Sequence, residues 1–220
     1  ALLVTSQLDY RLYRHLAVPL SAFSLLLLLL VVLPGIGYTV GGSSRWLRVG
    51  GIRFQPSELA KLSSIILIAW WMARIQRRAG TFKDGLLIPL AFVAAYAGLI
   101  IIEPDFGTTM LIGLVGMAIM FVGGTRIGYL LVAGLGGLSG LALLIAQNEE
   151  RRNRIIAFLD PEKYAKGEAF QLMQALYSFG SGGAMGVGLG ESIQKRHYLP
   201  EAHTDFIFAI LGEELGFRAT

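Results

Sequence analysis

Apolar residues run without a charge over lengths that match the thickness of a bilayer. Residues 16–33 form one such stretch, which as an α-helix extends ~27 Å, close to a hydrocarbon core of ~30 Å. Four more stretches share the pattern, interrupted only by Lys61: 59–73, 86–102, 108–122 and 128–146. The pattern therefore predicts an all-α integral membrane protein, a polytopic bundle with five spanning helices and a sixth that begins near Phe206.

Charge in the short loops predicts the orientation of these spans. Loops 1–15, 74–85 and 123–127 carry seven cations: Arg11, Arg14, Arg74, Arg77, Arg78, Lys83 and Arg126. The opposite short loops, 34–57 and 103–107, carry three: Arg45, Arg48 and Arg53. An excess of cations in short loops marks the cytoplasmic side. We therefore expect the first set of loops in the cytoplasm and the long connection 147–204 outside.

The connection 147–204 is the largest segment outside the predicted spans. It contains aromatic residues such as Phe158 and Tyr177, so we expect it to be ordered. Within it, residues 171–179 have the pattern of a short amphipathic helix. We treat residues 1–220 as a single transmembrane domain that includes this extracytoplasmic loop.

Composition agrees with a membrane protein, excludes cysteine chemistry and argues against nucleic-acid binding. Of the 220 residues, 54% are hydrophobic and 15% are charged, against about 25% charged in a soluble domain. Without cysteine, this sequence has neither disulfide nor thiolate chemistry. Basic loops explain the net charge of +4, so we expect no nucleic-acid binding. Because the sequence begins at Ala1 and breaks off inside an apolar run, we expect it to be a fragment of a longer protein.

Polar residues suited to chemistry gather at the predicted outer ends of the spans. Glu58 and Lys61 lie three residues apart, on one face of a helix that starts at Pro56. A lysine one turn inside a span needs a partner or a water-filled cavity. Two interpretations stay open: a structural ion pair with a lysine that reaches the interface, or a role in an outer cavity.

Two other outer loops add candidates on the same side. Asp105 lies in the turn 103–107, where it either caps the next helix or faces the same cavity. Arg45 stands beside Trp46, an aromatic residue typical of a membrane interface. The Arg45 guanidinium suits a lipid phosphate as well as a substrate pyrophosphate.

The stretch 180–190 is dense in glycine, and the basic pair Lys195 and Arg196 follows it. Backbone amides in such a loop can cradle phosphate, and the two cations favour an anionic ligand. The spacing matches neither a Walker A motif nor a dinucleotide-binding fingerprint. A plain flexible loop is therefore the alternative interpretation.

Asp205 is the strongest catalytic candidate. The polar run 194–205 passes directly into an apolar segment, so the carboxylate stands where water meets the membrane. His203 lies two residues before it, and on a continuous helix Glu213 would share roughly the same face. A helix N-cap is the alternative role for Asp205. The three histidines lack the spacing of a metal site, so we expect no protein metal ligands among them.

In these blocks the chain resembles the SEDS family of shape, elongation, division and sporulation proteins, which includes FtsW, RodA and SpoVE. The matching blocks keep their order along nearly the whole chain: 45–46, 54–61, 103–108, 154–161, 180–183, 186–190, 198–208 and 212–216. The block 199–205, Leu-Pro-Glu-Ala-His-Thr-Asp, favours the FtsW and SpoVE branch.

The resemblance implies a ten-span bundle in the bacterial cytoplasmic membrane. This chain would cover the end of span two, spans three to seven, the large outer loop and the start of span eight. It implies a peptidoglycan glycosyltransferase that polymerises lipid II beside a class B penicillin-binding protein and other divisome or elongasome proteins. Asp205 matches the essential outer aspartate of the family. Glu58, Lys61 and Asp105 match polar residues of its outer cavity.

The hypothesis that follows makes Asp205 a general base on a sugar hydroxyl of lipid II. The departing pyrophosphate then needs positive charge from Lys61, Arg45, Lys195, Arg196 or a divalent cation such as Mg²⁺ or Mn²⁺. His203 is a further substrate-binding candidate. The alternatives are a lipid II flippase, in which Lys61 lines a polar pathway, and a non-catalytic scaffold for division proteins.

Overall fold

The computed structural model of the chain describes residues 9–33, 37–40, 43–49, 52–167, 169–195, 206–218 and 220. The chain divides into two compact units, Ala1–Gly137 and Leu138–Thr220. A helix covers each of the five predicted spans: α2 (Tyr10–Val32), α3 (Pro56–Arg74), α4 (Ile88–Ile102), α5 (Phe106–Val122) and α6 (Ile127–Ala146). The prediction of a predominantly helical membrane protein is confirmed.

Three helices among the described residues are long and apolar enough to cross a membrane: Arg11–Val32, Phe82–Ile102 and Ile127–Ala146. The other two predicted spans are helices that fall short of that measure for different reasons. Helix α5 has 17 residues. Helix α3 has 19 residues but carries Glu58 and Lys61 near its start, and these charges lower its hydropathy.

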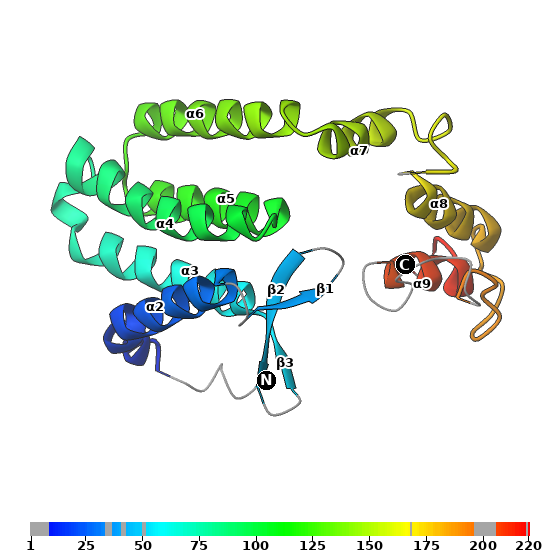
Figure 1. Cartoon of the computed structure of the whole chain (residues 1–220), viewed down its shortest axis with the longest axis horizontal. Helices are drawn as coiled ribbons and strands as arrows, with labels where there is room; N and C mark the ends of the chain where they lie inside the picture. Colours follow the sequence, from blue (N-terminus) through cyan, green and yellow to red (C-terminus); the bar gives the residue numbers. More distant parts are fainter. Residues whose placement is uncertain are drawn as a thin grey trace. The chain divides into compact units, whose positions relative to one another are not determined.

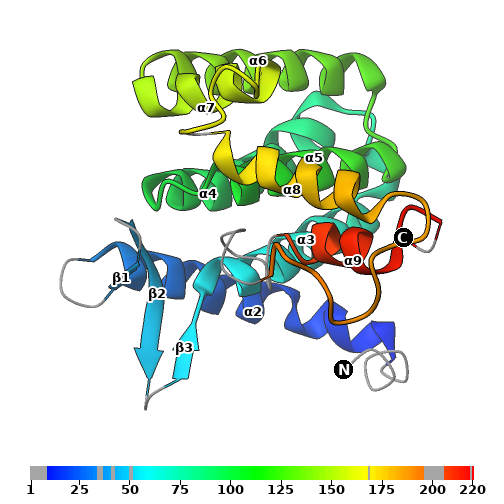
Figure 2. The same ribbon diagram turned by 90° about the vertical axis from the view of Figure 1, so that its right-hand side faces the viewer.

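Helices α4 and α5 lie over the pair α2 and α3 in the first unit (Figures 1 and 2). Tyr96, Ile68 and Met120 are fully buried or nearly so between them. The Tyr96 hydroxyl lies 3.0 Å from the Ser63 hydroxyl, which gives both buried polar groups a partner. A Cβ atom at Gly116 would stand 2.7 Å from the Val93 side chain, so the glycine permits the close approach of α5 to α4.

Two short helical segments connect α3 to α4 at the basic end of the first unit. They are a 3₁₀ turn, η1 (Gln76–Arg78), and a π-helical turn, η2 (Phe82–Leu87). The Trp71 indole donates a hydrogen bond to the Asp84 carbonyl at 2.9 Å, and the Thr125 hydroxyl donates to the Gly85 carbonyl at 2.8 Å. These bonds join the connection to α3 and to the start of α6.

A small antiparallel sheet occupies the connection between α2 and α3, which the all-α prediction treated as a loop. Its strands are β1 (Tyr38–Val40), β2 (Ser43–Val49) and β3 (Ile52–Phe54), in the order β1-β2-β3. Gly-Gly pairs at 41–42 and 50–51 separate the three runs in the sequence, a spacing typical of tight hairpins. The Arg53 guanidinium lies 5.3 Å from the centre of the Tyr38 ring.

The second unit contains three helices of the predicted outer connection and the last apolar segment. They are α7 (Glu149–Leu159), α8 (Phe170–Gly182) and α9 (Ile207–Leu215). Helix α8 confirms the amphipathic helix predicted over 171–179, whereas α7 was not predicted. Helix α9 begins at Ile207, close to the predicted start of the sixth span, and packs on α8.

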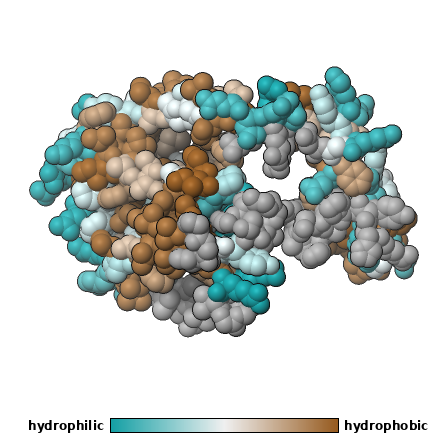
Figure 3. Space-filling view, viewed as in Figure 1, coloured by the Kyte–Doolittle hydropathy of each residue, from teal (hydrophilic) through white to brown (hydrophobic). Residues whose placement is uncertain are grey.

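Apolar side chains cover much of the visible surface of the helical first unit (Figure 3). On α6, Val132 and Leu135 are 72% and 69% exposed. Such contiguous apolar surface is stable in lipid, and in water it would favour aggregation.

Candidate functional site

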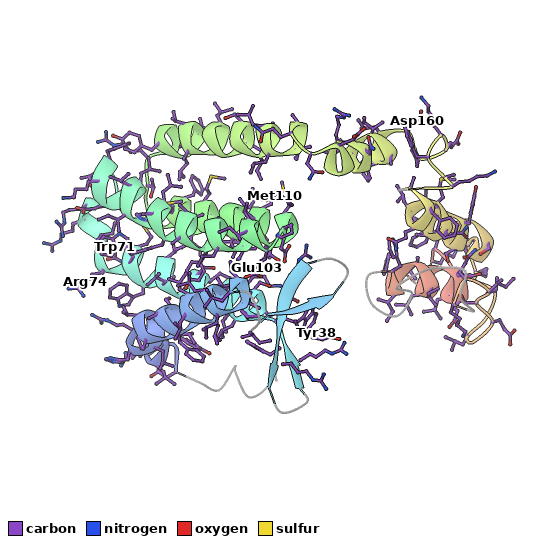
Figure 4. All side chains as sticks on the ribbon, viewed as in Figure 1. Tyr38, Trp71, Arg74, Glu103, Met110 and Asp160 are labelled. Atoms are coloured by element: carbon purple, nitrogen blue, oxygen red, sulfur yellow. The ribbon has the colours of Figure 1, made fainter. Side chains whose placement is uncertain are left out.

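The end of the first unit that the short-loop charges predict to face outward brings together three segments that are distant in the sequence. They are strand β2, the start of α3 and the turn 103–105 between α4 and α5. Figure 4 shows Glu103 beside β2, at the end of the helices opposite to Arg74. The polar candidates Arg45, Glu58, Lys61 and Asp105 therefore belong to one end of this unit.

Arg45 joins the sheet to the turn between α4 and α5. Its Nε donates to the Glu103 carbonyl at 2.8 Å, and its Nη2 donates to the Pro104 carbonyl at 2.7 Å. A guanidinium has five N–H donors, so three remain beyond these two bonds. Arg45 is thus fixed in place and still able to bind an anion.

Asp105 caps α5, so the helix-cap interpretation is confirmed. Its Oδ1 accepts from the Thr108 amide at 3.0 Å, and its Oδ2 accepts from the Thr108 hydroxyl at 2.9 Å. Both carboxylate oxygens take part in the cap. A substrate contact by Asp105 stays a prediction, and it would have to share these oxygens.

Glu58 and Lys61 form the ion pair that their spacing predicted. The Lys61 Nζ lies 2.8 Å from the Glu58 Oε1, with side chains 28% and 59% exposed. A pair with this exposure adds about 0–1 kcal/mol to stability. The Lys61 ammonium has two further N–H donors for a ligand.

Glu103 is the residue of this end that the sequence interpretation passed over. It is 2% exposed, and neither carboxylate oxygen has a hydrogen-bond partner among the described residues. Burial raises the pKa of Glu103 to about 7; the Asp105 charge adds to this effect, and the Arg45 charge opposes it. The sequence signal for Glu103 is its position directly after the charge-free run 86–102.

Glu213 organises the second unit. Its side chain is 1% exposed and accepts hydrogen bonds from the Ser192 hydroxyl, the Ser181 hydroxyl at 3.2 Å and the Ile193 amide at 3.2 Å. A weaker contact comes from the Gln194 amide at 3.4 Å. One buried carboxylate therefore joins α8, the loop before residue 196 and α9.

The glycine-rich stretch is held against the same helix. The Val187 amide donates to the Glu213 carbonyl at 2.9 Å, and the Gly188 amide donates to the Glu214 carbonyl at 3.0 Å. These two donors are therefore not free to cradle a phosphate. Lys195 pairs with Glu214 at 2.7 Å, so binding of an anion by Lys195 requires exchange of this partner.

Asp205, His203 and Arg196, including the proposed base, lie outside the described residues. Within the part of the chain that is described, no group of three or more His, Asp or Glu side chains is placed to hold a metal ion. The described residues thus provide no ready site for the divalent cation that the sequence left open.

A family model described as "Cell cycle protein", for FtsW, RodA and SpoVE, matches residues 1–218. Among curated proteins, a probable peptidoglycan glycosyltransferase FtsW of Trichlorobacter lovleyi is 42% identical over 98% of this chain and 56% of its own length. A protein of the same name from Nitrosococcus halophilus is 47% identical over 88% of this chain and 50% of its own length. The chain spans about half the length of these relatives.

Solved structures of related proteins also match this chain. A chain of a peptidoglycan synthase complex, whose structure addresses the coordination of polymerization and crosslinking, matches with TM-score 0.67 and 27% identity over 99% of this chain and 59% of that one. The rod shape determining protein RodA of Thermus thermophilus matches with TM-score 0.59 and 27% identity over 96% of this chain and 52% of that one. From the family model, the relatives and the shared fold, this chain belongs to the FtsW/RodA/SpoVE family of multi-pass membrane proteins.

Proposed function

We propose that the protein containing this chain is a peptidoglycan glycosyltransferase that polymerises lipid II at the outer face of the bacterial cytoplasmic membrane. The observation that carries the proposal is the identity of 42% to a probable FtsW glycosyltransferase across 98% of the chain. Residues 1–220 would be one incomplete transmembrane domain, and 147–204 its large extracytoplasmic loop. The missing half of the protein would supply the remaining spans.

Asp205 is the proposed catalytic base. It accepts the proton of a sugar hydroxyl on one lipid II, and that oxygen attacks the anomeric carbon of the growing chain. The bond from this carbon to the pyrophosphate oxygen breaks, and undecaprenyl pyrophosphate leaves with the electron pair. General-base assistance of this kind contributes ~10²–10⁴ in rate.

Cations at the outer end would bind the departing pyrophosphate. Arg45 is the best prepared, because two carbonyls orient it and three N–H donors remain. Lys61 and Lys195 each have a carboxylate partner, and a pyrophosphate would compete with it. Arg196 and His203 complete the proposed substrate contacts, and no step is assigned to a metal.

A class B penicillin-binding protein is the proposed partner, within the divisome or elongasome. The structural similarity to a chain of a peptidoglycan synthase complex supports this proposal. A partner that crosslinks strands beside their polymerase would receive the product directly.

The test is a lipid II polymerisation assay on the whole purified protein with its partner. Asp205→Asn should lower the initial rate of glycan formation by ~10²–10⁴. Glu162→Gln is the matched control, because Glu162 is an exposed acid of the same outer connection. An unchanged polymer yield from the folded Asp205→Asn protein would rule out Asp205 as the general base. Movement of lipid II across liposomes without polymer would favour the flippase instead.

A further inference from the structure

We infer that the first unit binds an anionic phospholipid of the cytoplasmic leaflet in a hollow between α2 and α3. The hollow lies at the end of these helices opposite to Glu103, where Figure 4 shows Arg74. Its volume is about 840 Å³, within the ~300–1,000 Å³ typical of ligand pockets. All of its lining residues come from α2 and α3.

The rim of the hollow is cationic. Its charged lining residues are Arg11, Arg14 and Arg74, with His15 beside them, and no lining residue is acidic. Among the described residues, none of these arginines forms a salt bridge. Three arginines that line one hollow without an acidic lining residue suit a phosphate, which accepts charge-assisted hydrogen bonds.

The floor of the hollow is apolar. Ile65, Ile66, Ala69 and Ala73 line it, together with Trp70. The Arg74 guanidinium lies 5.7 Å from the centre of the Trp70 ring, and tryptophan concentrates at membrane interfaces. A phosphate at the rim and an acyl chain along the floor would fill both surfaces, whereas a free anion would leave the floor empty.

The general excess of cations at this end does not by itself explain the cluster. Arg78 pairs with Asp84 at 3.4 Å, and Arg126 lies 6.0 Å from the centre of the Tyr129 ring. These residues also contribute to a positive cytoplasmic side, yet neither lines the hollow. The arginines of the rim are distinguished by facing one cavity with a lipid-compatible floor, as basic pockets between spans do when they bind acidic lipids.

Native mass spectrometry of the whole detergent-purified protein tests the site. Dioleoyl phosphatidylglycerol should bind the wild type more tightly than dioleoyl phosphatidylcholine, which has the same acyl chains and no net charge. Arg14→Gln/Arg74→Gln should weaken phosphatidylglycerol binding by about 30-fold, from the loss of two cations. Arg77→Gln/Arg126→Gln removes the same charge at the same membrane side and should bind like the wild type.

A filling variant separates the hollow from general charge attraction. Ala73→Phe keeps every arginine and should also lower phosphatidylglycerol affinity. Equal affinity of the wild type for the two lipids would overturn the site without any variant. An equal loss of phosphatidylglycerol affinity in the two double variants would show that the lipid is bound only by nonspecific charge attraction, and this result would overturn the site. Unchanged binding in both the rim and the filling variants would mean that another segment of the whole protein fills the hollow, and this result also overturns the inference.

Discussion

At the scale of single residues, Glu103 and Glu213 are both buried carboxylates, and they differ in their hydrogen-bond partners. Glu213 is surrounded by hydroxyl and amide donors, so both of its carboxylate oxygens have hydrogen-bond partners. Glu103 has no such donors among the described residues, and burial together with the neighbouring Asp105 charge raises its pKa to about 7. Replacement by glutamine should therefore have different effects: it should change the pH dependence of stability at Glu103 and loosen a loop at Glu213.

Glu103 should make stability depend on pH. Its folded-state pKa of about 7 lies above the ordinary value of 4.5, so the folded protein holds a proton that the unfolded chain releases. The free energy of unfolding should therefore fall as pH rises from about 4.5 to about 7 and then level off. The steepest slope should be about 1.4 kcal/mol per pH unit. Thermal unfolding of the whole protein from pH 5 to 8 measures this.

Glu103→Gln removes the titrating group and should flatten that profile, with a higher unfolding temperature than the wild type at pH 8. Glu162→Gln, an exposed acid, should leave the profile as it is. A Glu103→Gln protein with the wild-type profile would show that another group titrates in this window.

Glu213→Gln should loosen the loop that it holds. An amide of the same size offers one oxygen and sets its own N–H donors against the donors of Ser192 and Ile193, which costs about 1–3 kcal/mol locally. Hydrogen exchange of the peptide covering 183–195 should accelerate. Glu191→Gln is the control, because Glu191 is exposed in the same loop. Equal exchange in the two variants would contradict the anchoring role.

At the scale of elements, the contact between α8 and α9 depends on glycine. A Cβ atom at Gly182 would collide with the Gly212 carbonyl and stand 2.7 Å from the Glu213 Cα. Backbone atoms cannot move aside as the end of a side chain can. The same helix contains Gly180, where a Cβ atom would meet nothing within 4 Å.

Gly182→Ala should therefore destabilise the second unit although alanine favours a helix by about 1 kcal/mol over glycine. Gly180→Ala should be neutral or slightly stabilising for the same helical preference. Unfolding temperatures of the two variants of the whole protein compare them directly. Equal behaviour of the two alanines would show that α8 and α9 are not packed this closely.

The five spanning helices were predictable from the sequence because charge-free runs of bilayer length leave few alternatives, whereas the charged helix α7 was not predicted. The sheet β1–β3 was not predicted, because its three to seven residue strands lie between two spans whose hydropathy dominates the pattern. The pairing of Glu58 with Lys61 followed from helical spacing alone. The bonds of Arg45 to the turn at Glu103 did not, because they join residues 58 and 59 positions apart.

At the scale of the whole molecule, the two ends of the first unit differ in charge and in chemistry. One end carries the arginines around the hollow, which form no salt bridge with any described residue, and the other carries carboxylates with paired or oriented cations. The short-loop charges predict that the first end faces the cytoplasm. A lipid site and a polymerisation site would then act in opposite leaflets.

Cysteine labelling tests this orientation, since the present sequence contains no cysteine. In a whole protein with any other cysteines replaced, Glu162→Cys should react with a membrane-impermeant maleimide in intact spheroplasts. Arg77→Cys should react only after the membrane is permeabilised. The reverse pattern would invert the topology and place the hollow at the outer surface.

The binding of residues 187–195 to α9 has a mechanical consequence. Lys195 is bound to Glu214, and Phe206 adjoins the first residue of the same helix, so both flanks of the stretch that contains Asp205 share one rigid support. If a neighbouring protein displaced α9, Lys195 and Phe206 would move together with the helix. Under the proposed function, a partner that displaces this helix would shift the stretch that contains Asp205 without contacting the carboxylate itself.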